Sequence, residues 1–157
     1  TVKEGVFKMP YFEDMELGEK YTTSGRTITD GMASTFINMG LYTAPYFNDE
    51  SLANKSVLGW RAIPGRVALY IMGGLVETYG PKHGGSGLAY FVGVNNMTIK
   101  RPLKVGDTVH LVSERIELQE TSNPKWGREV ARESLINQKD ELVCQADIIH
   151  LYERKPK

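Results

Sequence analysis

The stretch PGRVALYIMGGLVETYG, residues 64–80, carries the strongest helix signal of the sequence. Pro64 suits the first turn of a helix. Apolar residues recur along the stretch at helical spacing: Val67, Ala68, Ile71, Met72, Leu75 and Val76. Only Arg66 and Glu77 are charged between Pro64 and Gly80. We therefore expect a core helix that other structure covers nearly all round.

Two adjacent glycines, Gly73 and Gly74, lie inside this predicted helix. Each costs about 1 kcal/mol relative to alanine in a helix interior. Such a cost is understandable where another backbone approaches the helix closely. We expect a sheet wrapped around the helix to supply that backbone.

After this helix the chain changes to long strand-like runs separated by turn signals. The runs cover residues 88–103, 107–121, 127–138 and 141–155, with turn signals VGD at 105–107, NPKWG at 123–127 and QKDE at 138–141. Short reverse turns predict that the strands pair as an antiparallel meander. Apolar and polar residues alternate along the runs, which predicts one dry and one solvated face with a bulge. The economical arrangement is an α+β fold in which a curved antiparallel sheet packs over one buried helix.

Before the core helix, the sequence predicts a strand and a further helix. Residues 21–29 are polar and β-branched, as in a strand. DGMASTFINMGL, residues 30–41, has helical spacing, with Thr29 or Asp30 as its N-cap and Gly40 near its end.

The connection from residue 41 to residue 63 is long for a compact domain. It contains four aromatic side chains and one weak helical turn, DESLANK, that Asp49 could cap. Because long ordered connections usually build a site, this segment is a functional candidate before any motif is considered.

Length, charge and cysteine content narrow the class of protein. The 157 residues suit one compact domain, and 19 basic residues balance 19 acidic ones, which argues against nucleic acid as a ligand. A single Cys144 cannot close an intrachain disulfide, and CxxC and HExxH motifs are absent, so we predict no metal site and no cofactor. No apolar run approaches the roughly 18 residues that span a bilayer. We expect a soluble, cytoplasmic protein without membrane contact.

The order of elements and three short motifs resemble the MaoC-like dehydratases, whose fold is the hotdog fold. YFEDMELGEKY at 11–21 looks like the family's F-x-D-x-x-x-G opening, and GRTITD at 25–30 looks like its strand into the first helix. NNMTIKRPLKVGDTV at 95–109 resembles the family's R-F-x-x-P-V-x-x-G-D-T strand and turn, and it is the distinctive motif. The resemblance covers nearly the whole chain and implies a single MaoC-like hotdog domain over residues 1–157.

The family's active-site signature, D-x-N-P-I-H-x-D, aligns without gaps with YTAPYFND, residues 42–49. Tyr42 then holds the Asp position and Phe47 the His position, while Pro45 and Asp49 agree with the pattern. In the family, Asp and His hold and deprotonate the water that adds to an enoyl thioester. Because Tyr42 and Phe47 cannot replace them directly, we expect a loss of about 10² to 10⁴ in rate.

A second catalytic device of the family is implied at the start of the core helix. There the family's H-G pair reads Pro64 and Gly65, so the glycine is kept and the histidine is not. Family members point backbone N–H groups of this region at the thioester carbonyl, and Gly65 with the positive end of the helix could still do so. The sequence is therefore better suited to bind an acyl thioester than to hydrate one.

The predicted substrate-binding residues are Tyr42, Pro45, Phe47, Asn48, Asp49, Arg61, Gly65 and Arg66. The aromatic residues, Tyr46 included, either line an acyl pocket or anchor the loop by plugging the core. Asn48 and Asp49 are the nearest groups that could hold a water, although helix capping is the favoured role of Asp49. Arg61 and Arg66 either contact coenzyme A phosphates or form ordinary salt bridges.

The histidines and the cysteine receive structural roles. His83 lies in the loop PKHGGSG, and a solvated loop residue is the favoured interpretation. His110 and His150 fall inside strand patterns and are expected on the sheet surface. Cys144 is expected to be a small buried hydrophobe.

Two functional hypotheses follow from the resemblance. The first is a cytoplasmic MaoC-like protein that binds acyl-CoA or an acyl-carrier thioester and acts as an enoyl-CoA hydratase or 3-hydroxyacyl dehydratase. The second is a catalytically silent acyl-CoA-binding or partner subunit, with a paralogue supplying the Asp and His. Family subunits usually pair their sheets edge to edge, which implies a homodimer or larger assembly.

Overall fold

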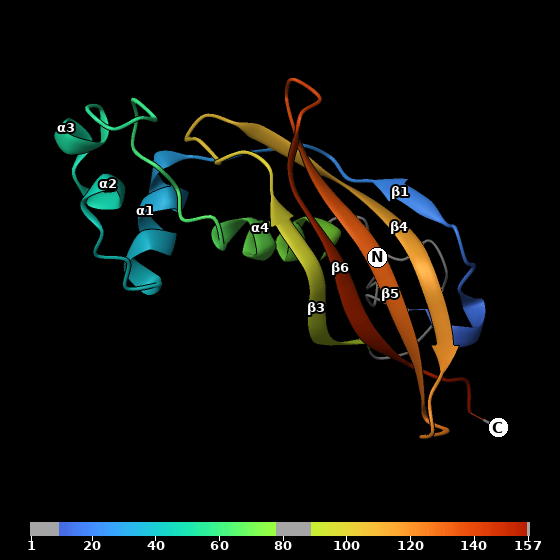
Figure 1. Ribbon diagram of the computed structural model, residues 1–157. Coiled ribbons are helices and arrows are strands. Elements are labelled where there is room, and N and C mark those ends of the chain that lie inside the picture. The colour runs from blue at the N-terminus through green and yellow to red at the C-terminus, as the bar shows by residue number, and fades with distance from the viewer. Residues whose placement is uncertain (1–9, 78–88, 157) are drawn as a thin grey trace, which may run out of the picture.

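The computed structural model describes residues 10–77 and 89–156, and an antiparallel sheet of six strands dominates it (Figure 1). The strands are β1 (Lys20–Thr22), β2 (Arg26–Thr27), β3 (Ala89–Ile99), β4 (Thr108–Glu120), β5 (Trp126–Asn137) and β6 (Leu142–Glu153). Their order is β1-β4-β5-β6-β3, and β2 also pairs with β4. The sheet curves around helix α4 (Val67–Glu77), as the α+β prediction required (Figure 1).

The predicted meander is wrong at its first step. Strands β4, β5 and β6 follow one another as predicted, but β3 pairs with β6 and not with β4. The turn before β4 bonds to Ile28 and does not connect β3 and β4 as a hairpin. The Gly106 N–H donates to the Ile28 carbonyl at 2.8 Å, and the Ile28 N–H donates to the Asp107 carbonyl at 2.8 Å. Strands β3 and β4 therefore lie on opposite sides of the β5–β6 pair, and β3 is an edge strand among the described residues.

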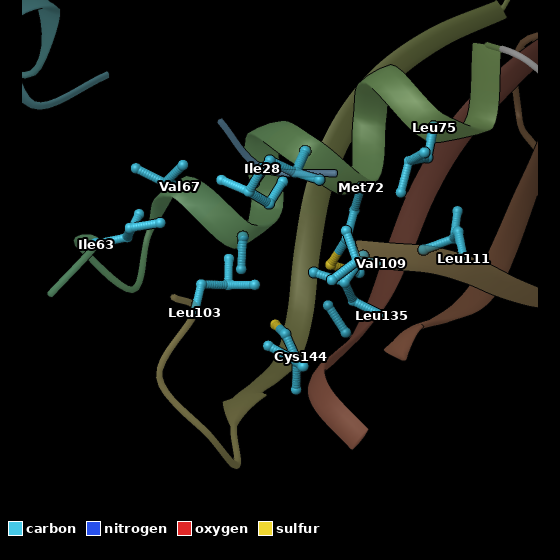
Figure 2. Packing of buried hydrophobic residues seen from close by; sticks show 14 of the residues in the cluster. Ile28, Ile63, Val67, Met72, Leu75, Leu103, Val109, Leu111, Leu135 and Cys144 are labelled. Carbon is cyan, nitrogen blue, oxygen red and sulfur yellow. The ribbon is translucent and has the colours of Figure 1, made fainter. Parts of the chain in front are cut away.

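Helix α4 packs its apolar face on the concave side of the sheet (Figure 2). The buried helix residues are Val67, Ala68, Ile71, Met72 and Leu75, and they share one cluster with Val109, Leu111, Leu135 and Cys144 of the sheet. The burial of Cys144 matches the prediction.

The expected all-round cover of α4 is wrong for the described part of this chain. A stripe of the helix is exposed: Arg66 just before it, then Tyr70, Gly73, Gly74 and Glu77. A Cβ atom built on Gly73 or Gly74 would meet no atom within 4 Å, so the expected close backbone is not supplied by the sheet. The sheet covers one side of the helix because it is a single curved layer.

In the described part of the chain the other helices precede α4: the 3₁₀ helix η1 (Phe12–Asp14), α1 (Asp30–Met39), α2 (Pro45–Asn48) and α3 (Glu50–Ala53). Thr29 caps α1 by accepting a hydrogen bond from the Met32 N–H at 3.2 Å, and Gly40 follows its last turn. The long connection contains two short helices where one helical turn was predicted. Helices α1 to α3 gather beyond one end of the sheet (Figure 1).

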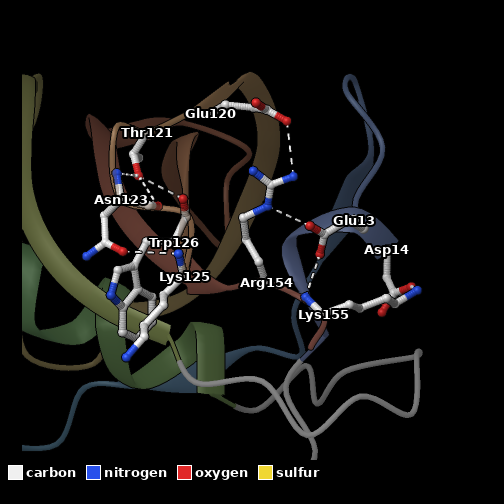
Figure 3. A network of polar contacts seen from close by, with 9 residues as sticks. All are labelled: Glu13, Asp14, Glu120, Thr121, Asn123, Lys125, Trp126, Arg154 and Lys155. Atoms are coloured by element: carbon white, nitrogen blue, oxygen red, sulfur yellow. Dashed lines mark hydrogen bonds and ion pairs between the residues drawn. The ribbon is translucent and has the colours of Figure 1, made fainter. Parts of the chain in front are cut away.

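Polar contacts tie the N-terminal helix η1 to the end of β6 (Figure 3). The Arg154 guanidinium donates to Glu13 at 2.7 Å and to Glu120 at 3.1 Å, and the Lys155 N–H donates to Glu13 at 2.9 Å. These contacts fix the end of the sheet that lies away from the predicted site.

Candidate functional site

The turn after α1 places Tyr42 against the end of that helix. Leu41 has a left-handed backbone with φ of 54°, which reverses the chain direction. A Cβ atom on Gly40 would lie 2.5 Å from Cε2 of Tyr42, so only glycine lets the Tyr42 ring pack this closely.

Three aromatic rings then pack on one another. The Phe47 ring lies edge to face with the Tyr42 ring at a centroid distance of 5.5 Å and with the Tyr46 ring at 5.3 Å. Tyr42 and Phe47 are half-buried, whereas Tyr46 is exposed. The two positions aligned with the family's Asp and His are therefore adjacent in space, and their aromatic rings contact each other.

The polar residues of this segment are engaged in local structure. The Asn48 side-chain amide donates to the Tyr42 carbonyl at 2.9 Å and to the Ala44 carbonyl at 3.2 Å. Asp49 accepts a hydrogen bond from the Leu52 N–H at 2.9 Å, which is the capping role favoured by the sequence. Pro45 is exposed at the first position of α2. Asn48 therefore fixes the backbone around Tyr42.

The two predicted phosphate ligands differ in their surroundings. Arg61 forms a salt bridge with Asp30 at the start of α1, and its side chain is only 19% exposed. Arg66 is exposed next to the first turn of α4. Arg61 thus forms a salt bridge, one of the two roles left open for it, and its contact with a phosphate stays a prediction.

The start of α4 offers backbone donors next to a close contact with β3. A Cβ atom on Gly65 would lie 2.6 Å from Cδ1 of Ile99, so glycine allows this approach. Among the described residues, no acceptor is bonded to the N–H groups of Gly65 and Arg66. Unpaired N–H groups at a helix N-terminus favour a negatively charged or strongly polarised oxygen.

A hollow of about 210 Å³ is lined by Asp30, Glu50, Trp60, Arg61, Lys104 and Val105. The Lys104 ammonium sits 5.6 Å from the centre of the Trp60 ring. Arg61 is the only predicted site residue in this lining. The sequence reasoning missed Lys104, since nothing in the order of residues predicts that the connection before β4 meets the loop that carries Trp60.

The remaining expectations concern histidines, metals and membranes. His83 lies outside the described residues. The surface assignment is wrong for His150, whose side chain is 17% exposed and whose Nδ1 lies 3.4 Å from a carboxylate oxygen of Glu129.

Within 10–77 and 89–156, no group of three or more His, Cys, Asp or Glu side chains could hold a metal ion. None of the helices in those ranges is long and apolar enough to cross a membrane.

Comparison with known proteins places this architecture in the hotdog class. A scan against family models and a search of curated proteins find no match. A solved protein of Mycobacterium tuberculosis described as a double hotdog fold covers 94% of this chain with 45% of its own length, at 22% identity and a TM-score of 0.72. The fold is therefore the hotdog fold.

Two further structures cover almost the whole of both chains. A MaoC-like dehydratase from Rhodospirillum rubrum matches 95% of this chain and 100% of its own, at 19% identity and a TM-score of 0.80. A monoamine oxidase regulatory protein from Archaeoglobus fulgidus matches 94% of this chain and 96% of its own, at 29% identity and a TM-score of 0.84. (R)-hydratases are also among the matching structures. The chain thus has the fold of the MaoC-like dehydratases and (R)-hydratases, as its motifs predicted.

Proposed function

We propose that residues 1–157 form a single MaoC-like domain that binds an enoyl or 3-hydroxyacyl thioester at the start of α4. The observation that carries the proposal is the pair of backbone N–H groups at Gly65 and Arg66, which have no bonded acceptor within 10–77 and 89–156. Donors in this position stabilise the charge that develops on a thioester carbonyl. The protein would act in the cytoplasm as a hydratase or dehydratase with an atypical site.

In this proposal, the half-buried rings of Tyr42 and Phe47 form one wall of the acyl site, and Pro45 and Asn48 shape the loop behind them. Neither ring can deprotonate a water near neutral pH. Asp49 is the nearest carboxylate in the sequence, and its cap bond to Leu52 commits one of its oxygens. The site is therefore equipped for binding, and its general acid and base are weak or come from elsewhere.

The hollow beside Trp60 is the proposed place for the carrier end of the thioester. Arg61 is neutralised by Asp30, so Lys104 and the exposed Arg66 are the cations left to meet phosphate groups. The indole of Trp60 offers an aromatic face for the carrier's adenine or pantetheine arm. This chemistry supports coenzyme A as the carrier.

A second candidate function is that of a catalytically silent partner subunit. The packing of Tyr42 and Phe47 on each other favours it, because the two positions that align with the family's Asp and His carry aromatic rings in contact. In that case a paralogue would contribute the acid and base, and this chain would contribute one wall of the pocket.

We propose that the chain forms at least a homodimer through β3. One side of β3 pairs with β6, and the other has no strand partner among the described residues. Tyr90, Phe91 and Val92 on this strand are 50%, 59% and 52% exposed. Unpaired, apolar edge strands are normally covered by pairing.

Crotonyl-CoA tests both functions on one protein. At 100 times its Kd, a ligand that binds only the folded state adds about 2.7 kcal/mol, which raises the melting temperature on the order of 5–10 °C for this size. We expect that rise, together with hydration at least 10²-fold slower than that of an Asp/His enzyme. The double variant Tyr42→Asp, Phe47→His should hydrate faster than the native chain.

The matched control is Leu17→Asp, which adds a carboxylate at a 66% exposed apolar residue away from the site and should leave hydration unchanged. No thermal shift with crotonyl-CoA would refute thioester binding. Full enzymatic turnover by the native chain that also survives Asp49→Ala would refute the account of the site. A thermal shift without any turnover would select the silent subunit over the hydratase.

A further inference from the structure

Strand β3 contains a bulge that decides which of its side chains face α4. Val94 pairs with Ile148 of β6, and both pack in the core cluster. Strict alternation from Val94 would turn Ile99 to the opposite face of the sheet. From Asn95 to Thr98, however, β3 advances three positions while the paired residues of β6 advance two. This extra residue reverses the alternation, so that Ile99 lies on the same face as α4.

The reversal brings Ile99 to the proposed thioester site. Ile99 pairs with Cys144, which belongs to the cluster that α4 shares with the sheet (Figure 2). A Cβ atom on Gly65 would lie 2.6 Å from Cδ1 of Ile99, so the Ile99 side chain occupies the space directly beside the Gly65 backbone. The N–H groups of Gly65 and Arg66 are the proposed donors to the thioester carbonyl. Ile99 therefore limits how closely this backbone can approach the sheet.

The bulge has a left-handed residue and a side-chain anchor. Asn96 has a φ of 52°, a conformation that asparagine adopts more readily than most residues. Its side-chain amide donates to Oδ2 of Asp147 at 2.7 Å. Asp147 lies between Ala146 and Ile148, which both pack in the core, so its side chain lies on the opposite, convex face of the sheet. The hydrogen bond therefore ties the bulge to β6 from outside the core.

Asp147 is in turn fixed by Arg132 of β5. The two residues pair across the strands, and the Arg132 guanidinium donates from Nε to Oδ1 at 2.8 Å and from Nη2 to Oδ2 at 3.2 Å. Such bidentate pairs are strong and geometrically specific. The hydrogen bond from Arg132 also holds the pKa of Asp147 below its ordinary value. The carboxylate, which is on a residue only 5% exposed, therefore stays charged near neutral pH and accepts both partners.

We propose that Arg132, Asp147 and Asn96 are positioning residues for the thioester site. They fix the bulge of β3, the bulge seats Ile99 against Gly65, and this contact holds the two N–H donors at the start of α4 in place. Arg132 and Asp147 lie on the face of the sheet opposite to α4, so they act through β3 and not on the ligand. The effect on ligand binding rests on the proposed function, whereas the seating of Gly65 can be measured without a ligand.

The amide resonance of Gly65 in the NMR spectrum of the ligand-free chain tests the seating. Asp147→Ala removes the anchor without altering β3 and should shift this resonance. Asn96→Asp keeps the size and the left-handed preference of the residue but sets a second carboxylate against Asp147, so it should also shift the resonance. The matched control is Ser134→Ala, which removes a 2.9 Å hydrogen bond from Gln145 on the same convex face and should leave the Gly65 resonance in place.

Calorimetric titration with crotonyl-CoA then tests the effect on the site. It is done well below the melting temperature of each variant, where a loss of stability alone does not change the Kd. We expect Asp147→Ala to raise the Kd about tenfold, equivalent to about 1.4 kcal/mol, and Ser134→Ala to leave it unchanged. Adding Asn96→Gly to Asp147→Ala should recover part of the lost affinity, because glycine adopts a φ of 52° without an anchor. A merely structural role of Asp147 would give no such recovery.

An unshifted Gly65 resonance in both Asp147→Ala and Asn96→Asp would overturn the positioning role. A native Kd in Asp147→Ala would do the same. Asn96→Asp carries both measurements if Asp147→Ala does not fold. A native chain that does not bind crotonyl-CoA would refute the proposed function, and the Gly65 resonance would still decide whether these three residues seat the start of α4.

Discussion

Asp49 matches the active-site pattern of the family, but its carboxylate caps a local helix. It occupies the last position of the active-site signature, and its Oδ1 accepts a hydrogen bond from the Leu52 N–H at 2.9 Å. Removing a capping side chain costs about 0.5–2 kcal/mol. We expect Asp49→Ala to lower the free energy of unfolding by about 1 kcal/mol in urea titrations, with the thermal shift by crotonyl-CoA retained.

Asp49→Asn is the control, because asparagine caps as well as aspartate and should leave stability nearly unchanged. If both variants abolished the thermal shift equally, Asp49 would act on the ligand through its charge. Capping was predictable here because donor and acceptor are three residues apart. The Arg61–Asp30 salt bridge spans 31 positions, so local sequence patterns could not choose it over a phosphate contact.

At the scale of elements, periodicity predicted α4 and the long strands closely, because burial imposes a period on each. Which strands pair with each other was harder to predict: β3 and β4 follow one another in the sequence, yet β3 pairs with β6. The competing use of the Gly106 turn, which bonds to Ile28, depends on a contact distant in sequence. The exposed stripe of α4 was not predicted for a related reason. A low number of charged residues indicates that a helix is covered, but it does not tell whether the covering surface belongs to the same chain or to another chain.

The core face of α4 should dominate stability. Met72 is completely buried in the cluster between helix and sheet. Truncation of such a side chain costs about 2–5 kcal/mol. We expect Met72→Ala to lower the free energy of unfolding by that amount in urea titrations, whereas Glu77→Ala on the exposed stripe should change it by no more than about 0.5 kcal/mol. Equal costs for the two variants would mean that another surface covers the stripe.

At the scale of the whole molecule, the exposed large apolar side chains of the described chain, Leu17 apart, gather in two regions. The first is the segment from α1 to the loop after α3: Met39, Leu41, Tyr46, Leu52, Val57 and Leu58. The second is formed by α4 and β3: Tyr70, Tyr90, Phe91, Val92 and Ile99. The second region adjoins the open edge of the sheet and the two bare glycines of α4. A second copy that pairs along β3 would cover the side that the sheet leaves open.

Val92 allows a test of this pairing that spares the fold. It lies in an irregularity of β3 where no β6 partner is paired with it, and it is 52% exposed. A lysine on an edge strand opposes pairing with another chain. We expect Val92→Lys to raise the dimer dissociation constant at least tenfold in sedimentation equilibrium, equivalent to about 1.4 kcal/mol. Leu17→Lys, a change at a 66% exposed site away from that edge, should leave the dimer intact. A Val92→Lys chain that dimerises as tightly as the native one would place the interface elsewhere, and the apolar segment from Met39 to Leu58 would then be the surface to mutate next.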